Sequence, residues 1–163
     1  MNQINSNFGT LIIDSECAPE AHLRSIAKEV FQNIAHLQQP YPDFKKWYFN
    51  KVVSGVIDGS RGFILELRDG KMAGVAILKD TVEEKKICTI SVAEEFKSKG
   101  LGVRLFEKSM RLLDTEKPLA TVSENRLPEF EKIFQYLNYE YFAEYRGFYV
   151  PQKSEFSFNG VLQ

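Results

Sequence analysis

Cysteine and histidine are scarce in this sequence, with two of each among its 163 residues. Cys17 and Cys88 are too few for a disulfide framework and show no metal-ligand spacing. His22 and His36 lie far apart, with no cysteine or second histidine beside them. We therefore expect no metal site and a reducing compartment. Cys88 falls in a strand-like run, where a buried, unreactive thiol is the expected interpretation.

The sequence also lacks a long apolar run and an excess of either charge. No segment approaches the length that crosses a membrane, and no basic stretch followed by apolar residues opens the chain. We expect a cytoplasmic protein without a membrane partner. The formal net charge is −1, with both signs scattered along the chain. This distribution argues against a nucleic-acid binder, which usually carries a basic stripe, although it leaves a local basic patch open.

The composition is that of a folded domain, with 44% hydrophobic and 26% charged residues. Hydrophobic periodicity and turn residues such as Asp69-Gly70 predict one mixed α/β domain over residues 1–163. Its core is expected at 8–150, and 151–163 is expected to be a loosely attached C-terminal extension. The predicted order is a strand at Phe8–Asp14, helices from Pro19 to Leu37 and at Asp43–Val53, strands at Gly62–Arg68, Met72–Leu78 and Lys86–Val92, a helix at Leu101–Leu113, a strand at Pro118–Val122, a helix at Leu127–Leu137, and a closing hairpin within Tyr139–Val150 with its turn near Tyr145–Gly147.

The segment from Val92 to Gly102 is the most informative one for function. A strand ends at Val92, a polar loop follows, and a helix begins where Gly100 and Gly102 flank Leu101. Free amides at a helix N-terminus, with glycines that allow close approach, suit a pyrophosphate. A Gly-x-Gly at such a junction is common in other roles, but a P-loop is excluded because no Gly-Lys-Ser/Thr follows. A Rossmann site is excluded because the preceding strands form a meander.

This segment resembles motif A of the GNAT N-acetyltransferases, Arg/Gln-x-x-Gly-x-Gly/Ala after a strand. Lys97-Ser98-Lys99-Gly100-Leu101-Gly102 matches it except at the first position, and the element order fits from about Phe8 to Val150. The resemblance implies a mostly antiparallel central sheet flanked by helices, and acetyl-CoA as co-substrate. It implies that Ile90, Ser91 and Val92 bind the pantetheine arm and that Lys97, Ser98, Lys99, Gly100, Leu101, Gly102 and Val103 hold the pyrophosphate. Asn125 is a further candidate contact to the coenzyme, or alternatively a helix cap.

The residues that complete the chemistry in many GNAT relatives are replaced here. The resemblance gives the Val92 N–H the role of polarising the thioester oxygen. Phe134, however, stands at the position where many relatives carry a tyrosine that acts as the general acid. Tyr136 is a candidate acid, with a surface or interface tyrosine as the alternative. Lys86 stands near the position of the usual glutamate base. Glu84 is a candidate base acting through water, with an exposed turn residue as the alternative.

The acceptor is the part that the sequence defines least. The resemblance places the acceptor between the loop joining the first two helices and the closing hairpin, lined by Gln38, Tyr41, Phe44, Trp47, Tyr141, Tyr145 and Arg146. The first hypothesis is an N-acetyltransferase acting on a primary amine of a small molecule, a protein or an aminoacyl-tRNA. The second is a catalytically silent acyl-CoA-binding or protein-interaction module, and the third is a purely structural domain. A homodimer is left open.

Overall fold

The computed structural model describes residues 9–163, so the predicted first residue of the first strand, Phe8, lies outside it. The strands join into one seven-stranded sheet of order β1-β2-β3-β4-β5-β7-β6. The elements are β1 (Gly9–Ile13), α1 (Glu20–Ile34), η1 (Ala35–Gln38), α2 (Phe44–Trp47), η2 (Tyr48–Val52), α3 (Val53–Asp58), β2 (Arg61–Arg68), β3 (Lys71–Asp80), β4 (Lys85–Val92), η3 (Glu94–Phe96), α4 (Leu101–Leu113), β5 (Leu119–Ser123), α5 (Leu127–Tyr136), β6 (Tyr141–Arg146) and β7 (Ser154–Phe158).

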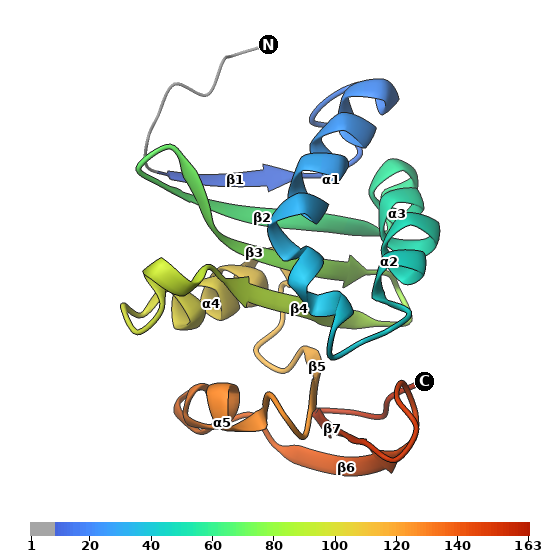
Figure 1. The fold of residues 1–163 in the computed structure, drawn as a ribbon, viewed down its shortest axis with the longest axis vertical. Coiled ribbons are helices and arrows are strands. Elements are labelled where there is room, and N and C mark those ends of the chain that lie inside the picture. Colours follow the sequence, from blue (N-terminus) through green and yellow to red (C-terminus); the bar gives the residue numbers. More distant parts are fainter. Residues whose placement is uncertain (1–8) are drawn as a thin grey trace.

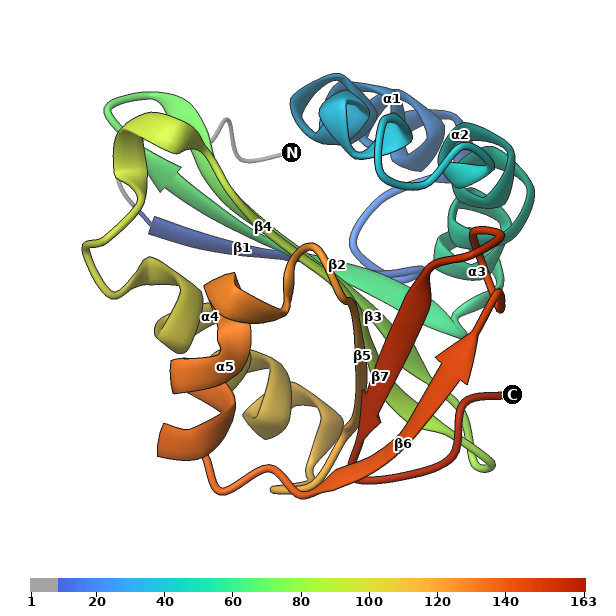
Figure 2. The ribbon, with the colours of Figure 1, turned by 60° about the horizontal axis from the view of Figure 1, so that its bottom comes forward.

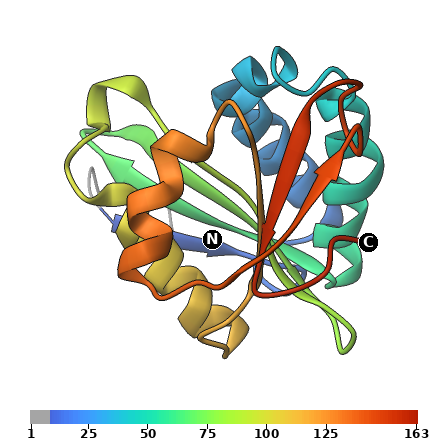
Figure 3. The ribbon, with the colours of Figure 1, turned by 90° about the horizontal axis from the view of Figure 1, so that it is seen from below.

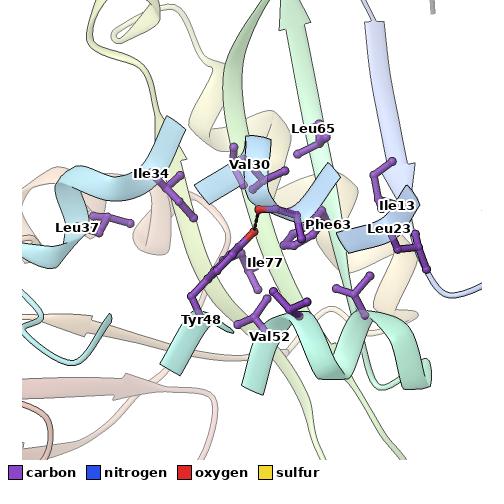
Figure 4. Packing of buried hydrophobic residues seen from close by; sticks show 14 of the residues in the cluster. Ile13, Leu23, Val30, Ile34, Leu37, Tyr48, Val52, Phe63, Leu65 and Ile77 are labelled. Atoms are coloured by element: carbon purple, nitrogen blue, oxygen red, sulfur yellow. Dashed lines mark hydrogen bonds between the residues drawn. The ribbon is translucent and has the colours of Figure 1, made fainter. Parts of the chain in front are cut away.

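Helices cover both faces of the sheet. Figures 1 and 2 show α1, α2 and α3 on one face, and α4 and α5 on the other. Each layer closes its own buried cluster, one built around Val30, Tyr48 and Phe63 and the other around Leu105 and Phe134. In the first cluster the buried Tyr48 hydroxyl donates to the Ala27 carbonyl at 2.5 Å, which satisfies its only polar group (Figure 4). The sheet therefore separates two apolar layers, one on each of its faces.

Most predicted elements are confirmed, including the α/β class and the mostly antiparallel sheet. The helix over Leu101–Leu113 has the predicted bounds, and Asp69 and Gly70 form the β2–β3 turn with φ of 52° and 73°. The helix predicted at Asp43–Val53 continues instead to Asp58 through the π-helical segment η2. It ends where Gly59 adopts a left-handed conformation, at φ 92°.

The end of the chain differs from the prediction. The expected hairpin within Tyr139–Val150 is wrong in its second half, because β6 ends at Arg146 and its partner β7 lies at Ser154–Phe158. The expectation of a loosely attached extension over residues 151–163 is wrong as well. β7 lies inside the sheet, paired with β5 on one side and β6 on the other. Its buried residues Ser154, Glu155, Ser157 and Phe158 are fixed by these two ladders.

The sheet opens between β4 and β5, its one parallel pair within residues 9–163. These strands pair only at Lys86↔Leu119 and Ile87↔Ala120, and then diverge toward their C-terminal ends. Figure 3 shows β5 and β7 leaning away from β4 at this point. The divergence leaves backbone groups of both strands without a ladder partner inside the sheet.

Candidate active site

The backbone of β4 directs polar groups into the gap between β4 and β5. The Ala93 N–H donates to the Ala73 carbonyl at 2.8 Å, beside the antiparallel register Gly74↔Val92 and Val75↔Ser91. Hydrogen-bonded and non-hydrogen-bonded residue pairs alternate along an antiparallel ladder. The backbone N–H and C=O of Ser91 therefore point toward β3, while those of Ile90 and Val92 point away from it. The N–H and C=O groups of Ile90 and Val92 therefore point toward β5, where an extended ligand arm can pair with them.

Arg126 lies across this gap, and the sequence did not single it out. Its Nη2 donates to the Ile90 carbonyl at 3.0 Å, and its guanidinium lies 4.9 Å from the centre of the Phe130 ring. Its Nε also lies 3.5 Å from a Glu129 oxygen. A ligand that pairs with Ile90 must share or displace this guanidinium. The signal that could have identified Arg126 is its place between β5 and α5, one residue after Asn125.

An exposed loop joins the open end of β4 to the start of α4. Gly100, at φ 79°, is the residue before the first turn of this 13-residue helix, and Ser98 also has a positive φ. Lys97 is partly engaged by carboxylates, 3.1 Å from Glu94 and 3.9 Å from Glu129. The first helical turn contains no acidic residue. Its free amides and exposed cations make this loop suitable for a phosphate group.

A cavity of about 610 Å³ lies along the strands where they diverge. Tyr41, Phe44 and Trp47 wall it from the α1–α3 layer, and Phe106, Phe130 and Phe134 wall it from the α4–α5 layer. The wall between them comes mainly from the sheet and is mixed. Its apolar residues include Ile87, Ile90 and Val122, and its polar or charged ones are Arg61, Lys79, Glu84, Lys86, Cys88, Thr89, Thr121 and Glu155. Its volume is that of a typical small-molecule site.

Glu155 on β7 is the buried carboxylate of this cavity, and the sequence did not single it out. Its side chain is 5% exposed, and both carboxylate oxygens lie 3.5 Å from the Tyr41 hydroxyl. Burial raises the pKa of Glu155 to about 7, although a hydrogen bond with Thr121 and the charge of Lys86 oppose the rise. A carboxylate with such a pKa can accept a proton near neutral pH.

Two tyrosines lie beside this carboxylate. Burial, followed by the charge of Glu155, raises the pKa of Tyr41 to about 12. The same two causes raise the pKa of Tyr149, which hydrogen-bonds with Thr121. The Tyr41 and Tyr149 rings meet edge to face at 6.2 Å. Both phenols therefore stay protonated at neutral pH and can donate a proton or a hydrogen bond.

Comparison with known proteins identifies the family of this fold. The model of the acetyltransferase (GNAT) family matches residues 21–127, which is most of the chain. The chain belongs to the GNAT acetyltransferase family. No curated protein matches it significantly in sequence.

Solved GNAT structures share the fold across nearly the whole chain. A protein assigned to this family from Desulfovibrio desulfuricans aligns with a TM-score of 0.63 at 16% identity, over 92% of this chain and 97% of that one. The ribosomal-protein-S18-alanine N-acetyltransferase of Escherichia coli aligns with a TM-score of 0.60 at 17% identity, over 92% of each chain. A GNAT acetyltransferase from Elizabethkingia anophelis, solved with acetyl-CoA bound, gives 0.56 at 12% identity, over 94% and 97%.

Within this GNAT fold, the predicted catalytic residues lie in different environments. Glu84 lines the cavity, but its carboxylate lies 3.1 Å from Lys79 Nζ. Tyr136 is 69% exposed on α5 and does not line the cavity. Phe134, at the position of the missing family tyrosine, is buried against Phe106 and Phe158.

The predicted binding residues are also only partly brought together. Tyr41 and Trp47 line the cavity, whereas Tyr141 and Arg146 are exposed on β6 outside it. Asn125 is exposed, and the residue preceding α5 is Arg126, with no side-chain cap. No cluster of three or more potential metal ligands occurs within residues 9–163. In the same range, no helix is long and apolar enough to cross a membrane.

Proposed function

We propose that this GNAT protein binds acetyl-CoA and transfers its acetyl group to a primary amine. The observation that carries the proposal is the opening between β4 and β5, with the glycine-containing loop at its open end and a cavity along it. The loop before α4 would hold the pyrophosphate. The backbone N–H and C=O groups of Ile90 and Val92 that point toward β5 would hold the pantetheine arm. The acceptor would enter the cavity.

The chemistry needs a neutral amine, a polarised carbonyl and a proton for the leaving sulfur. Acetyl-CoA supplies the acetyl thioester. The acceptor nitrogen forms the new C–N bond as the C–S bond breaks, the nitrogen loses a proton, and the sulfur gains one. The Val92 N–H would donate to the carbonyl oxygen. Glu155 would accept the proton from nitrogen, because its carboxylate is buried in the cavity with a pKa of about 7.

Tyr149 would supply the proton for sulfur in place of the missing family tyrosine. It lines the cavity, and its raised pKa keeps its hydroxyl protonated. Tyr136 fits this role less well because most of its side chain faces solvent. Glu84 fits the role of base less well because its carboxylate is already paired with Lys79 at 3.1 Å.

Calorimetric titration with acetyl-CoA and a turnover assay test the two halves of the proposal. We expect acetyl-CoA to bind, and free CoA to be released when a suitable primary amine is added. Absence of acetyl-CoA binding would overturn the whole proposal. Binding without turnover on small amines, peptides or aminoacyl-tRNA would instead favour the silent acyl-CoA-binding module.

A further inference from the structure

Two cations that line the cavity form no salt bridge with a carboxylate. Arg61 at the start of β2 and Lys86 on β4 both line the cavity and are partly buried. Within residues 9–163, neither lies within 4.0 Å of an Asp or Glu oxygen, whereas Lys79 in the same cavity is paired with Glu84. Partly buried charges without a partner are costly, so such a pair is suited to an anionic ligand.

The two cations act on the same small region of the cavity. Arg61 Nη1 donates to Cys88 Sγ at 3.2 Å, and the positive charges of Lys86 and Arg61 both lower the pKa of this thiol, against the larger effect of burial. The neutral thiol does not balance them, and Glu84, whose charge also acts on this thiol, is paired with Lys79. The same Lys86 charge also reaches Glu155. The charge of Lys86 thus acts both on the thiol that Arg61 contacts and on Glu155, which would accept a proton from the amine.

Aromatic side chains adjoin the cationic region. The Arg61 guanidinium lies 5.7 Å from the centre of the Trp47 ring, and Trp47 lies 5.6 Å from Phe44. Both rings line the cavity. A flat apolar ligand body can pack against this wall while an anionic group on it reaches Arg61 and Lys86.

We propose that the acceptor is a small amino carboxylate with an apolar or aromatic body, whose carboxylate binds Arg61 and Lys86 while its amine faces Glu155. This inference rests on the proposed acetyl transfer for the role of the amine. The carboxylate site itself rests on the two cations and the aromatic wall. Arg61 can bind a carboxylate through two parallel N–H groups, and Lys86 adds a point charge.

Trp47 provides a readout that does not depend on catalysis, since it is the single tryptophan of the chain. We would titrate the protein with 4-(aminomethyl)benzoate and with benzylamine, which differ only in the carboxylate, and follow Trp47 fluorescence. We expect the Kd of 4-(aminomethyl)benzoate to be roughly 10- to 100-fold lower, as for charge-assisted hydrogen bonds. Equal affinity for the two probes would overturn the inference.

Variants assign the effect to the two cations. Arg61→Gln and Lys86→Gln should each raise the Kd of 4-(aminomethyl)benzoate roughly tenfold and leave that of benzylamine unchanged. Arg61→Lys should restore part of the affinity, which guards against loss of the Arg61 packing against Gly55. Lys85→Gln is the matched control, because Lys85 is the exposed neighbour on β4 and is paired with Asp80. An equal loss in Lys85→Gln would contradict the site.

Turnover separates this inference from the proposed function. If both hold, kcat/KM favours 4-(aminomethyl)benzoate over benzylamine, and Arg61→Gln removes the preference. Equal turnover of the two amines would sink the carboxylate site and leave the acetyltransferase proposal standing. If 4-(aminomethyl)benzoate but not benzylamine quenches Trp47 fluorescence and acetyl-CoA does not bind, the carboxylate site stands and the acetyltransferase proposal falls.

Discussion

Glu155 combines three properties at one residue: burial, a raised pKa and a position in the cavity. Its carboxylate contacts the Tyr41 hydroxyl, and with a pKa of about 7 its protonation state changes near neutral pH, where the proposed transfer to an amine would take place. A side chain that is protonated below this pKa cannot take a proton from the amine, so the rate should depend on pH.

Replacing Glu155 with glutamine tests this role. The kcat/KM of the unmodified protein should rise with pH up to about 7 and then level off, as Glu155 loses its proton. Glu155→Gln should lower kcat/KM by roughly 100-fold and remove this rise. Glu84→Gln serves as the comparison, because Glu84 shares the cavity but is paired with Lys79. A rise that survives in Glu155→Gln and disappears in Glu84→Gln would reassign the base.

Replacing Tyr149 or Tyr136 with phenylalanine tests which of the two is the general acid. Tyr149→Phe should lower kcat by roughly 100-fold without changing the Kd of acetyl-CoA, because only the proton donor is lost. Tyr136→Phe should leave both constants unchanged, since Tyr136 is 69% exposed on α5. Steady-state kinetics and calorimetry provide the two measurements. The opposite pattern would assign the acid to Tyr136.

Gly100 tests the loop that begins α4. Gly100→Glu places a side chain and a negative charge beside the amides that we propose hold the pyrophosphate, and should raise the Kd of acetyl-CoA by roughly tenfold or more. Gly147→Glu is the matched control: Gly147 has a similar φ of 72° but lies in the turn after β6, with nothing within 4 Å of an added Cβ. Calorimetry should show normal binding in the control. Normal binding in both variants would contradict the pyrophosphate assignment.

At the scale of elements, α4 lies against β3 through a single glycine. A Cβ on Gly74 would lie 2.8 Å from Leu105 Cδ1 and 3.4 Å from Leu101 Cδ2, and Leu105 is fully buried. The missing side chain lets the helix approach the sheet, which positions its N-terminus at the open end of β4.

Gly74→Ala should therefore destabilise the protein by about 1–3 kcal/mol, because Leu105 has no space into which to move. Denaturant unfolding would measure this loss. Gly160→Ala is the control, since its added Cβ would lie at an ordinary 3.5 Å from Leu119 Cδ1. An effect of the same size at both glycines would show that loss of glycine, rather than crowding of α4, is responsible.

Elements with strong local signals could be predicted from the sequence, and β7 could not. α4 has an apolar stripe bounded by Gly100 and by Asp114, whose left-handed conformation ends the helix, so local chemistry fixes both ends. The Ser154–Phe158 segment is short and half polar, and it is buried because of its pairing with β5, more than thirty residues earlier. No local pattern records such a contact.

The same reason explains which site residues could be predicted. Gly100 and Gly102 belong to a contiguous motif, so their place before and within the first turn of α4 could be anticipated. Glu155 is an ordinary glutamate in the sequence, and only the register Ser123↔Glu155 brings it to the cavity. Arg61 and Lys86 likewise reach the same cavity from different strands. The loop before α4 was therefore predictable, whereas the residues of the cavity depend on long-range pairing.

At the scale of the whole molecule, Glu155 makes the free energy of unfolding depend on pH. Its folded-state pKa of about 7 lies above the ordinary 4.5, so the folded protein holds this proton more tightly than the unfolded chain. The resulting stabilisation is complete below about pH 4.5 and is lost as the pH rises to about 7. At higher pH a charged carboxylate stays buried, which weakens the fold.

Glu155→Gln should consequently be more stable than the unmodified protein at pH 8, by roughly 1–3 kcal/mol, and about equally stable at pH 4.5. Urea unfolding at the two pH values would measure this difference. Glu83→Gln, at an exposed turn position, should change little at either pH. A gain that is the same at both pH values would contradict the buried charge as its cause.

The place of β7 has a consequence for protein synthesis. Strands β1 to β4 are neighbours in sequence order and can pair as they leave the ribosome, but β5 and β6 are made before the strand that lies between them. Until β7 emerges, the edges of β5 and β6 that it will join have no strand to pair with. The strand that closes these edges also carries Glu155. During translation, the edges of β5 and β6 that face each other across the sheet are therefore paired in the same event that brings Glu155 into the cavity.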